Sequence, residues 1–162
     1  MSAPYSLDAA AIQALLPHRF PMLMVDHVEA VVPGEWARAI KRVRADEPWV
    51  PGHFPGEPVL PGVLITEAFA QVAGIVALSA HPDDAGRTVF LVGLDKVRFR
   101  RPVRPGEVLS LEVETLQVRR RIWRFAARAT VDGERAAEAE LMATIADSTR
   151  SPRPVTGEPT RR

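Results

Sequence analysis

The sequence predicts an α+β domain in which an antiparallel sheet wraps around one long, buried helix. Two observations carry this prediction: residues 62–80 are apolar on nearly every side, and strand-like segments occur both before and after them. A helix that is apolar all round is buried all round. Strands on both sides of a single helix favour a sheet that covers it. We expect one domain over residues 1–146 and a disordered tail over residues 147–162.

The first half of the chain is expected to hold a short helix, two strands and a loop. Residues 6–16 have the apolar spacing of a helix, with Ser6 or Asp8 as its cap and Pro17 as its stop. Residues 22–32 are apolar enough for a strand, and residues 36–44 alternate as a second strand would. Residues 47–61 contain five prolines and two glycines, a density that predicts a loop.

The second half is expected to be mostly strands. After the helix at residues 62–80, residues 83–87 read as a turn, and residues 88–94, 97–101 and 108–118 read as strands. Residues 122–131 and 136–145 are predicted to pair as a hairpin, because Asp132-Gly133 between them is a strong turn signal.

Composition removes several classes of function. The chain has no cysteine, which excludes disulfides, thiolate zinc sites and cysteine nucleophiles. The net charge of +1 gives no indication of a nucleic-acid partner. No metal-binding histidine spacing, phosphate loop, dinucleotide fingerprint or serine-hydrolase elbow is present. Without a signal-peptide pattern, and with a carboxylate inside the apolar stretch, we expect a cytoplasmic protein that does not insert into membranes.

Glu67 is the first candidate for chemistry. It lies in the predicted apolar helix, where burial should raise its pKa and suit it to carry a proton near neutral pH. Gln71 follows one turn later on the same face and could orient the carboxylate. A structural carboxylate paired with a strand arginine fits the same spacing.

His53 is the second candidate, in a loop whose prolines and glycines could fix its position. An imidazole both takes and returns a proton near neutrality. Gly62 follows Pro61 at the start of the helix, where unpaired backbone N–H groups could polarise a carbonyl oxygen. His18, His27 and His81 are weaker candidates. Both His53 and Gly62 could instead have a purely structural role.

Several motifs together resemble one known family. They are Leu16-Pro17-His18-Arg19-Phe20-Pro21, Gly52-His53-Phe54-Pro55-Gly56, Pro61-Gly62-Val63-Leu64, Glu67-Ala68-Phe69-Ala70-Gln71, Asp95-Lys96-Val97-Arg98-Phe99 and Pro105-Gly106-Glu107. In this order, over roughly residues 7–145, they are similar to the FabZ-type (3R)-hydroxyacyl-acyl-carrier-protein dehydratases.

The resemblance implies a hot-dog fold, a dimer that further assembles as a trimer of dimers, and active sites at the dimer interface. His53 and Glu67, fourteen positions apart, match the family's catalytic pair, with His53 facing Glu67 of the other subunit. The backbone of Gly62 and Val63 would bind the thioester oxygen, Gln71 would orient Glu67, and no cofactor or metal is needed. Candidates for the acyl tunnel are Phe20, Phe54, Pro55 and Phe99. Phe20 stands where many members have tyrosine, which leaves the chain-length preference open.

The activity that the resemblance implies is removal of water from a (3R)-hydroxyacyl-acyl-carrier-protein to give the trans-2-enoyl product. The alternatives are a hot-dog thioesterase, a dehydratase-isomerase, a dehydratase of a specialised lipid or polyketide pathway, and a noncatalytic acyl-binding subunit. Thioesterases generally lack the Gly-His-Phe-Pro-Gly loop, and the isomerases typically have aspartate on the helix.

The acidic acyl carrier protein is the expected partner. Five cations fall within nine residues and form the candidate docking site, which we call the basic segment: Lys96, Arg98, Arg100, Arg101 and Arg104. A second cluster, at Arg119, Arg120, Arg121, Arg124 and Arg128, is better explained as a solvated strand face.

Overall fold

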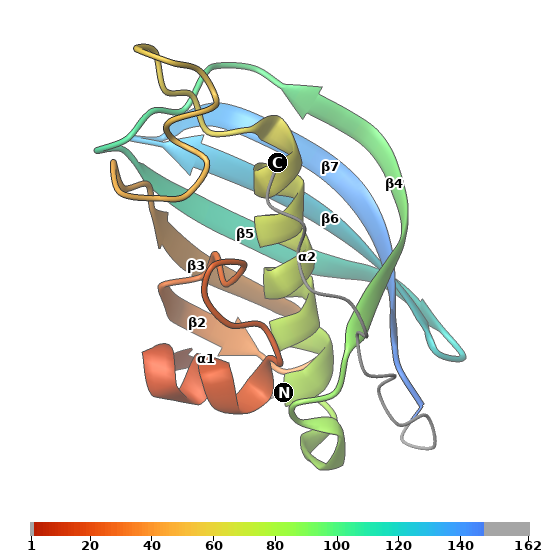
Figure 1. Cartoon of the computed structure of the whole chain (residues 1–162). Helices are drawn as coiled ribbons and strands as arrows, with labels where there is room; N and C mark the ends of the chain where they lie inside the picture. The colour runs from red at the N-terminus through yellow and green to blue at the C-terminus, as the bar shows by residue number, and fades with distance from the viewer. Residues whose placement is uncertain (1, 148–162) are drawn as a thin grey trace, which may run out of the picture.

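A computed structural model of the chain describes residues 2–147, in which a seven-stranded antiparallel sheet curls around one long helix (Figure 1). The predicted α+β class is confirmed. The elements are, in chain order, β1 (Tyr5–Leu7), α1 (Ala9–Leu15), β2 (His27–Val32), β3 (Trp36–Arg42), α2 (Gly62–Ser79), a 3₁₀ turn (Pro82–Asp84), β4 (Val89–Phe99), β5 (Val108–Arg119), β6 (Ile122–Val131) and β7 (Glu134–Ile145).

Helix α2 forms the centre of the core. Its side chains Phe69, Ile75 and Leu78 are fully buried, as are Leu109 and Leu111 on β5. Buried and less buried residues alternate along the first half of β5, so one face of the strand is turned to the helix. Length and composition alone would let α2 cross a membrane, but two thirds of it is buried inside the protein, as expected of a core helix.

The sheet has the order β1-β2-β3-β5-β6-β7-β4, so the long strand β4 lies at one edge. Strands β6 and β7 form the predicted hairpin, with Val131 opposite Glu134 and positive φ at both Asp132 and Gly133. Strand β4 runs unbroken where we predicted two strands. The predicted break corresponds to an irregularity in the β4–β7 pairing, near Lys96 with φ 52°.

The N-terminal predictions needed correction in their boundaries. Helix α1 begins at Ala9 because Asp8 is its cap, with the Ala11 N–H donating to Asp8 Oδ1 at 2.8 Å; Ser6 lies in β1. Residues 22–26 are not strand, although we predicted one from residue 22. Their backbone bonds a side chain instead: Gln71 accepts from the Met24 N–H at 2.8 Å and donates to the Met22 carbonyl at 2.7 Å.

The proline-rich loop contains neither helix nor strand, as predicted, and a buried ion pair anchors it. Lys41 on β3 is 4% exposed, and its Nζ lies 3.1 Å from both carboxylate oxygens of Glu47. The same carboxylate accepts hydrogen bonds from Trp49 Nε1 at 2.8 Å and from the Arg44 N–H at 2.9 Å. The Trp49 carbonyl then accepts from the His53 N–H at 3.1 Å, which ties this anchor to His53. The predicted tail lies outside the described residues, except for Asp147.

Candidate active site

His53 is held with one ring nitrogen engaged and the other available. Its Nδ1 lies 2.6 Å from the Val59 carbonyl oxygen. Because a carbonyl only accepts, Nδ1 carries a hydrogen, and in the neutral ring the lone pair is on Nε2. The ring also stacks on Phe54, with centroids 4.1 Å apart. This arrangement suits a general base that acts through Nε2.

The start of α2 presents unpaired backbone donors. The Pro61 carbonyl accepts from Leu64 and Ile65, whereas among the described residues the N–H groups of Gly62 and Val63 have no backbone acceptor. The Phe99 ring of β4 covers Gly62 so closely that a Cβ there would lie 2.8 Å from the ring's Cζ. Gly62 is therefore required for this packing, and its N–H lies at the positive end of the helix dipole.

These parts line one hollow of about 500 Å³. Its walls include His53, Gly62, Val63 and Phe99, together with Arg100 and Arg101 after β4. The hollow therefore combines a base, backbone donors and apolar walls, which is what a polarised acyl group requires.

Glu67 lies further along α2 and is held by two side chains. Its Oε1 accepts a hydrogen bond from Gln71 Nε2 at 2.8 Å and lies 3.4 Å from His18 Nε2. Gln71 is fully buried, and its bonds to Met22 and Met24 fix which way its amide points. The predicted contact between Gln71 and Glu67 is thus present.

The pKa of Glu67 lies below its ordinary value, and our prediction of a raised pKa is wrong for this chain. Burial does raise the pKa, as predicted, but the hydrogen bonds from His18 and Gln71 and the charge of His18 outweigh burial. The prediction lacked His18, which lies 49 positions before Glu67. No local spacing pattern could have indicated that contact, although His18 is part of the Leu-Pro-His-Arg motif.

His53 and Glu67 do not meet within residues 2–147 of one chain. No hydrogen bond or ion pair joins them there, and Glu67 does not line the hollow that contains His53. Of the tunnel candidates, Phe99 lines the hollow, whereas Phe20, Phe54 and Pro55 do not; Phe20 is 83% and Phe54 54% exposed. The pairing of His53 and Glu67 across subunits remains a prediction.

Residues 16–140 match the family described as a FabA-like domain. This chain belongs to that family. Curated FabA-like relatives named 3-hydroxyacyl-[acyl-carrier-protein] dehydratase FabZ include one from Thermomicrobium roseum, 52% identical over 87% of this chain and 94% of the relative. Another, from Desulforamulus reducens, is 53% identical over 86% of this chain and 97% of the relative.

Solved structures confirm the hot-dog fold expected of a FabA-like chain. The dehydratase heterocomplex ApeI:P from Xenorhabdus doucetiae superposes with a TM-score of 0.73 at 23% identity, over 85% of this chain and 92% of that one. The protein smu.793 from Streptococcus mutans, bound to acetyl CoA, superposes with a TM-score of 0.61 at 14% identity, over 80% of this chain and 93% of that one.

The basic segment of this FabA-like chain is largely paired with carboxylates. Lys96 contacts Glu140, Arg100 contacts Glu138, Arg101 contacts Glu107 and Glu134, and Arg104 contacts Glu57. Arg98 differs, because in the described part of the chain its guanidinium contacts only the Val97 carbonyl, at 2.8 Å. Lys96 on β4 and Arg100 just after it both reach carboxylates of β7.

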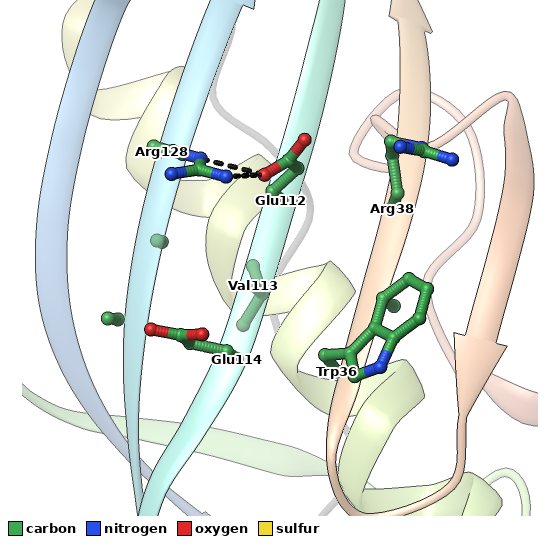
Figure 2. A pocket seen from close by; sticks show the side chains of 9 residues that line it. Trp36, Arg38, Glu112, Val113, Glu114 and Arg128 are labelled. Carbon is green, nitrogen blue, oxygen red and sulfur yellow. Dashed lines mark hydrogen bonds and ion pairs between the residues drawn. The ribbon is translucent and has the colours of Figure 1, made fainter.

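A second hollow, of about 380 Å³, lies over β3, β5 and β6 (Figure 2). Of its lining side chains, Trp36 and Glu114 point away from α2, and Arg128 is paired with Glu112. No residue predicted for catalysis or tunnel lining is among its walls. Within residues 2–147 no group of three or more potential metal ligands occurs.

Proposed function

We propose that this chain is a (3R)-hydroxyacyl-acyl-carrier-protein dehydratase of fatty-acid biosynthesis whose acid–base pair is His53 and Glu67. Relatives named as such dehydratases are about half identical to this chain over nearly their whole length, which supports the activity. The observation that carries the catalytic assignment is His53, whose Nδ1 is bonded to the Val59 carbonyl and whose side chain belongs to a residue lining the hollow.

The proposed reaction takes place in this hollow, with Glu67 supplied by a second subunit. The Gly62 and Val63 N–H groups bind the thioester oxygen and make the C2 proton more acidic. His53 Nε2 removes that proton, and Glu67 gives a proton to the departing C3 hydroxyl, so that water leaves and the trans-2-enoyl thioester forms. General acid–base groups of this kind contribute about 10²- to 10⁴-fold each.

The site is proposed to be shared between two subunits, paired through β4. Strand β4 has no buried residue in the single chain, and its apolar side chains Phe90, Val92 and Leu94 are 40–55% exposed. An apolar edge strand of this length is a template for pairing with a second strand. The same strand ends at Phe99 beside His53's hollow, so pairing there brings a partner chain to the site. A trimer of such dimers and a cytoplasmic location remain part of the proposal.

The acyl group is proposed to arrive on acyl carrier protein, docked at the basic segment. Arg100 and Arg101 line the hollow, so the segment borders the place where the substrate must enter. Arg98 is the cation of this segment that has no carboxylate partner in the described chain, and it is therefore the one best able to pair with an acidic protein.

The decisive experiment measures turnover of 3-hydroxyacyl-carrier protein by the purified protein alone. We expect loss of water without release of free thiol, which a thioesterase would produce. His53→Ala and Glu67→Gln should each lower kcat by at least ~10²-fold while the circular dichroism spectrum stays unchanged. An inactive wild-type protein, or a folded Glu67→Gln variant with near-normal kcat, would contradict the assignment.

A further inference from the structure

The two carboxylate oxygens of Glu67 have different surroundings. Oε1 accepts the hydrogen bond from Gln71 and lies next to His18 Nε2, at 2.8 and 3.4 Å respectively. In the described chain Oε2 has no hydrogen-bond or ion-pair partner. One oxygen is therefore held in place from two sides, and the other is left for a different role.

The state of His18 follows from its other ring nitrogen. Nδ1 is buried and has no hydrogen-bond partner among the described residues. A ring hydrogen on Nδ1 alone would be a buried donor without an acceptor, which is costly, so Nε2 is the nitrogen that carries the hydrogen. That hydrogen faces Glu67 Oε1.

The other groups around His18 leave this contact undisturbed. The neighbouring cation, Arg19, directs its guanidinium to the carbonyls of Gln13, Leu16 and His18. Gln71 is neutral and already committed to Glu67, Met22 and Met24. Glu67 is thus the one charged group that the ring of His18 contacts within residues 2–147.

We propose that His18 is a positioning residue, which together with Gln71 holds Glu67 Oε1 so that Oε2 is the oxygen that delivers the catalytic proton. This proposal rests on the proposed dehydratase function. Two donors make Oε1 the less basic oxygen, so the acidic proton resides on Oε2. During dehydration that proton moves to the C3 hydroxyl as the C3–O bond breaks. The C2 proton passes to His53, and the new negative charge of Glu67 is stabilised by donors already at Oε1.

Two substitutions of His18 separate positioning from packing. In His18→Gln the side-chain amide can place a donor where Nε2 stands, whereas in His18→Asn the shorter amide places it only where Nδ1 stands. Neither side chain titrates, and both are polar and smaller than imidazole. His27→Gln, which changes a histidine on β2 that does not line the hollow, serves as the control for losing an imidazole.

We expect His18→Asn and His18→Ala to lower kcat about tenfold, the low end for a lost hydrogen bond to a charged group, with little change in KM. Losing a donor to the ionised carboxylate raises the pKa of Glu67. The limb of the pH–rate profile that Glu67 governs should therefore move to higher pH in both variants. His18→Gln should keep most of kcat and the wild-type limb, and His27→Gln should behave as wild type.

Equal losses in His18→Gln and His18→Asn would overturn the proposal, as would a loss of kcat with no movement of that limb, because either result indicates packing. If His18→Ala does not fold, the Gln and Asn variants decide the question. Wild-type protein without dehydratase activity would instead refute the proposed function, which is a separate outcome.

Discussion

The side chain at position 62 has almost no room to grow. In Gly62→Ala the new Cβ would overlap the Phe99 ring, so either the ring or the start of α2 must move. Overpacking of this kind costs about 1–3 kcal/mol, and here it displaces the N–H groups that polarise the substrate. We expect kcat/KM to fall at least tenfold in steady-state assays. Adding Phe99→Leu, which removes the crowding ring, should restore part of the loss; a fully active Gly62→Ala enzyme would show that the contact is dispensable.

Glu47 gives a prediction about stability and pH. Burial raises the pKa of Glu47, but hydrogen bonds from the Arg44 N–H, Trp49 and Lys41, with the charge of Lys41, bring the pKa below its ordinary value of 4.5. A carboxyl whose pKa is lowered by folding stabilises the protein above its unfolded pKa, and this contribution is lost as the pH falls through the lowered folded value. Chemical denaturation should therefore show stability declining below about pH 4.5.

Replacing Glu47 by Gln leaves the buried ammonium of Lys41 without its counter-charge. Breaking one side of a buried ion pair costs about 3–5 kcal/mol. We expect the free energy of unfolding, measured with urea at pH 7, to fall by that amount. The stability of the variant should also depend less on pH below about 4.5 than that of the wild type. Because Glu47 anchors the loop that carries His53, kcat should fall as well. As a comparison, Glu57→Gln changes an exposed carboxylate of the same loop and should cost less than 1 kcal/mol.

At this scale the sequence predicted the contact of Gln71 with Glu67, because helical spacing alone brings such residues together. It could not predict that His18 lies against the same carboxylate. That contact depends on how the segment after α1 returns to α2, and therefore on tertiary packing. The direction of the Glu67 pKa shift was wrong for the same reason. Whether His53 and Glu67 act as a pair stays a prediction.

Among the elements, β4 carries the clearest prediction. A lysine at Val92 would place a charge in the proposed pairing of two β4 edges, where like charges would face each other across the dimer axis. We expect Val92→Lys to weaken dimerisation more than about tenfold by light scattering, with parallel loss of activity.

Val118 on β5 provides a matched control, since it is 48% exposed compared with 52% for Val92 but lies on an interior strand of the sheet. Val118→Lys should leave the oligomer and the activity intact. If Val92→Lys remains as dimeric and active as wild type, the subunits pair elsewhere.

The local sequence pattern predicted whether a segment is helix or strand better than it predicted where the segment begins and ends. Helix α2 and the β6–β7 hairpin were predicted because each is specified locally, by a continuous apolar run and by Asp132-Gly133. The strand predicted from residue 22 begins only at His27. The intervening backbone is satisfied by the side chain of Gln71, a partner 47 and 49 positions away that no window of local sequence contains.

For the whole molecule, shared active sites predict complementation between inactive variants. Mixing His53→Ala and Glu67→Gln subunits under exchange gives heterodimers in which one of the two sites has both native residues. With random pairing, about one quarter of wild-type activity should return, as expected for a two-fold symmetric dimer. Each variant alone stays inactive. A monomeric protein, or no recovery despite exchange verified by mass spectrometry, would contradict a shared site.

Recognition of the carrier protein is also a property of the whole surface. Charge reversal of Arg98 should raise KM for carrier-protein substrate about tenfold and reduce its salt dependence, while sparing small thioester analogues. Arg120→Glu, in the second cluster, should change neither. Equal losses with both kinds of substrate would assign Arg98 to the fold or the hollow rather than to docking.

The fold class and the family were predicted from the sequence and are confirmed, because the apolar helix and the flanking strands specify the fold while the motifs specify the family. The assembly could not be predicted from composition or periodicity. It depends on which exposed apolar surface meets a second chain, and β4 became the candidate for that surface only when its edge position was known.

The hydrogen bonds of the Gln71 amide restrict which single-base changes the codon at this position can tolerate. Both the amide nitrogen and the amide oxygen are engaged: the nitrogen donates to Glu67 and to the Met22 carbonyl, and the oxygen accepts from the Met24 N–H. A glutamine codon becomes a glutamate or a lysine codon by one base change. Glutamate would set a second carboxylate beside Glu67 and could not donate to Met22, whereas lysine could not accept from Met24. A random mutational screen under selection for fatty-acid synthesis should therefore recover position 71 as depleted in both of these readily reached substitutions.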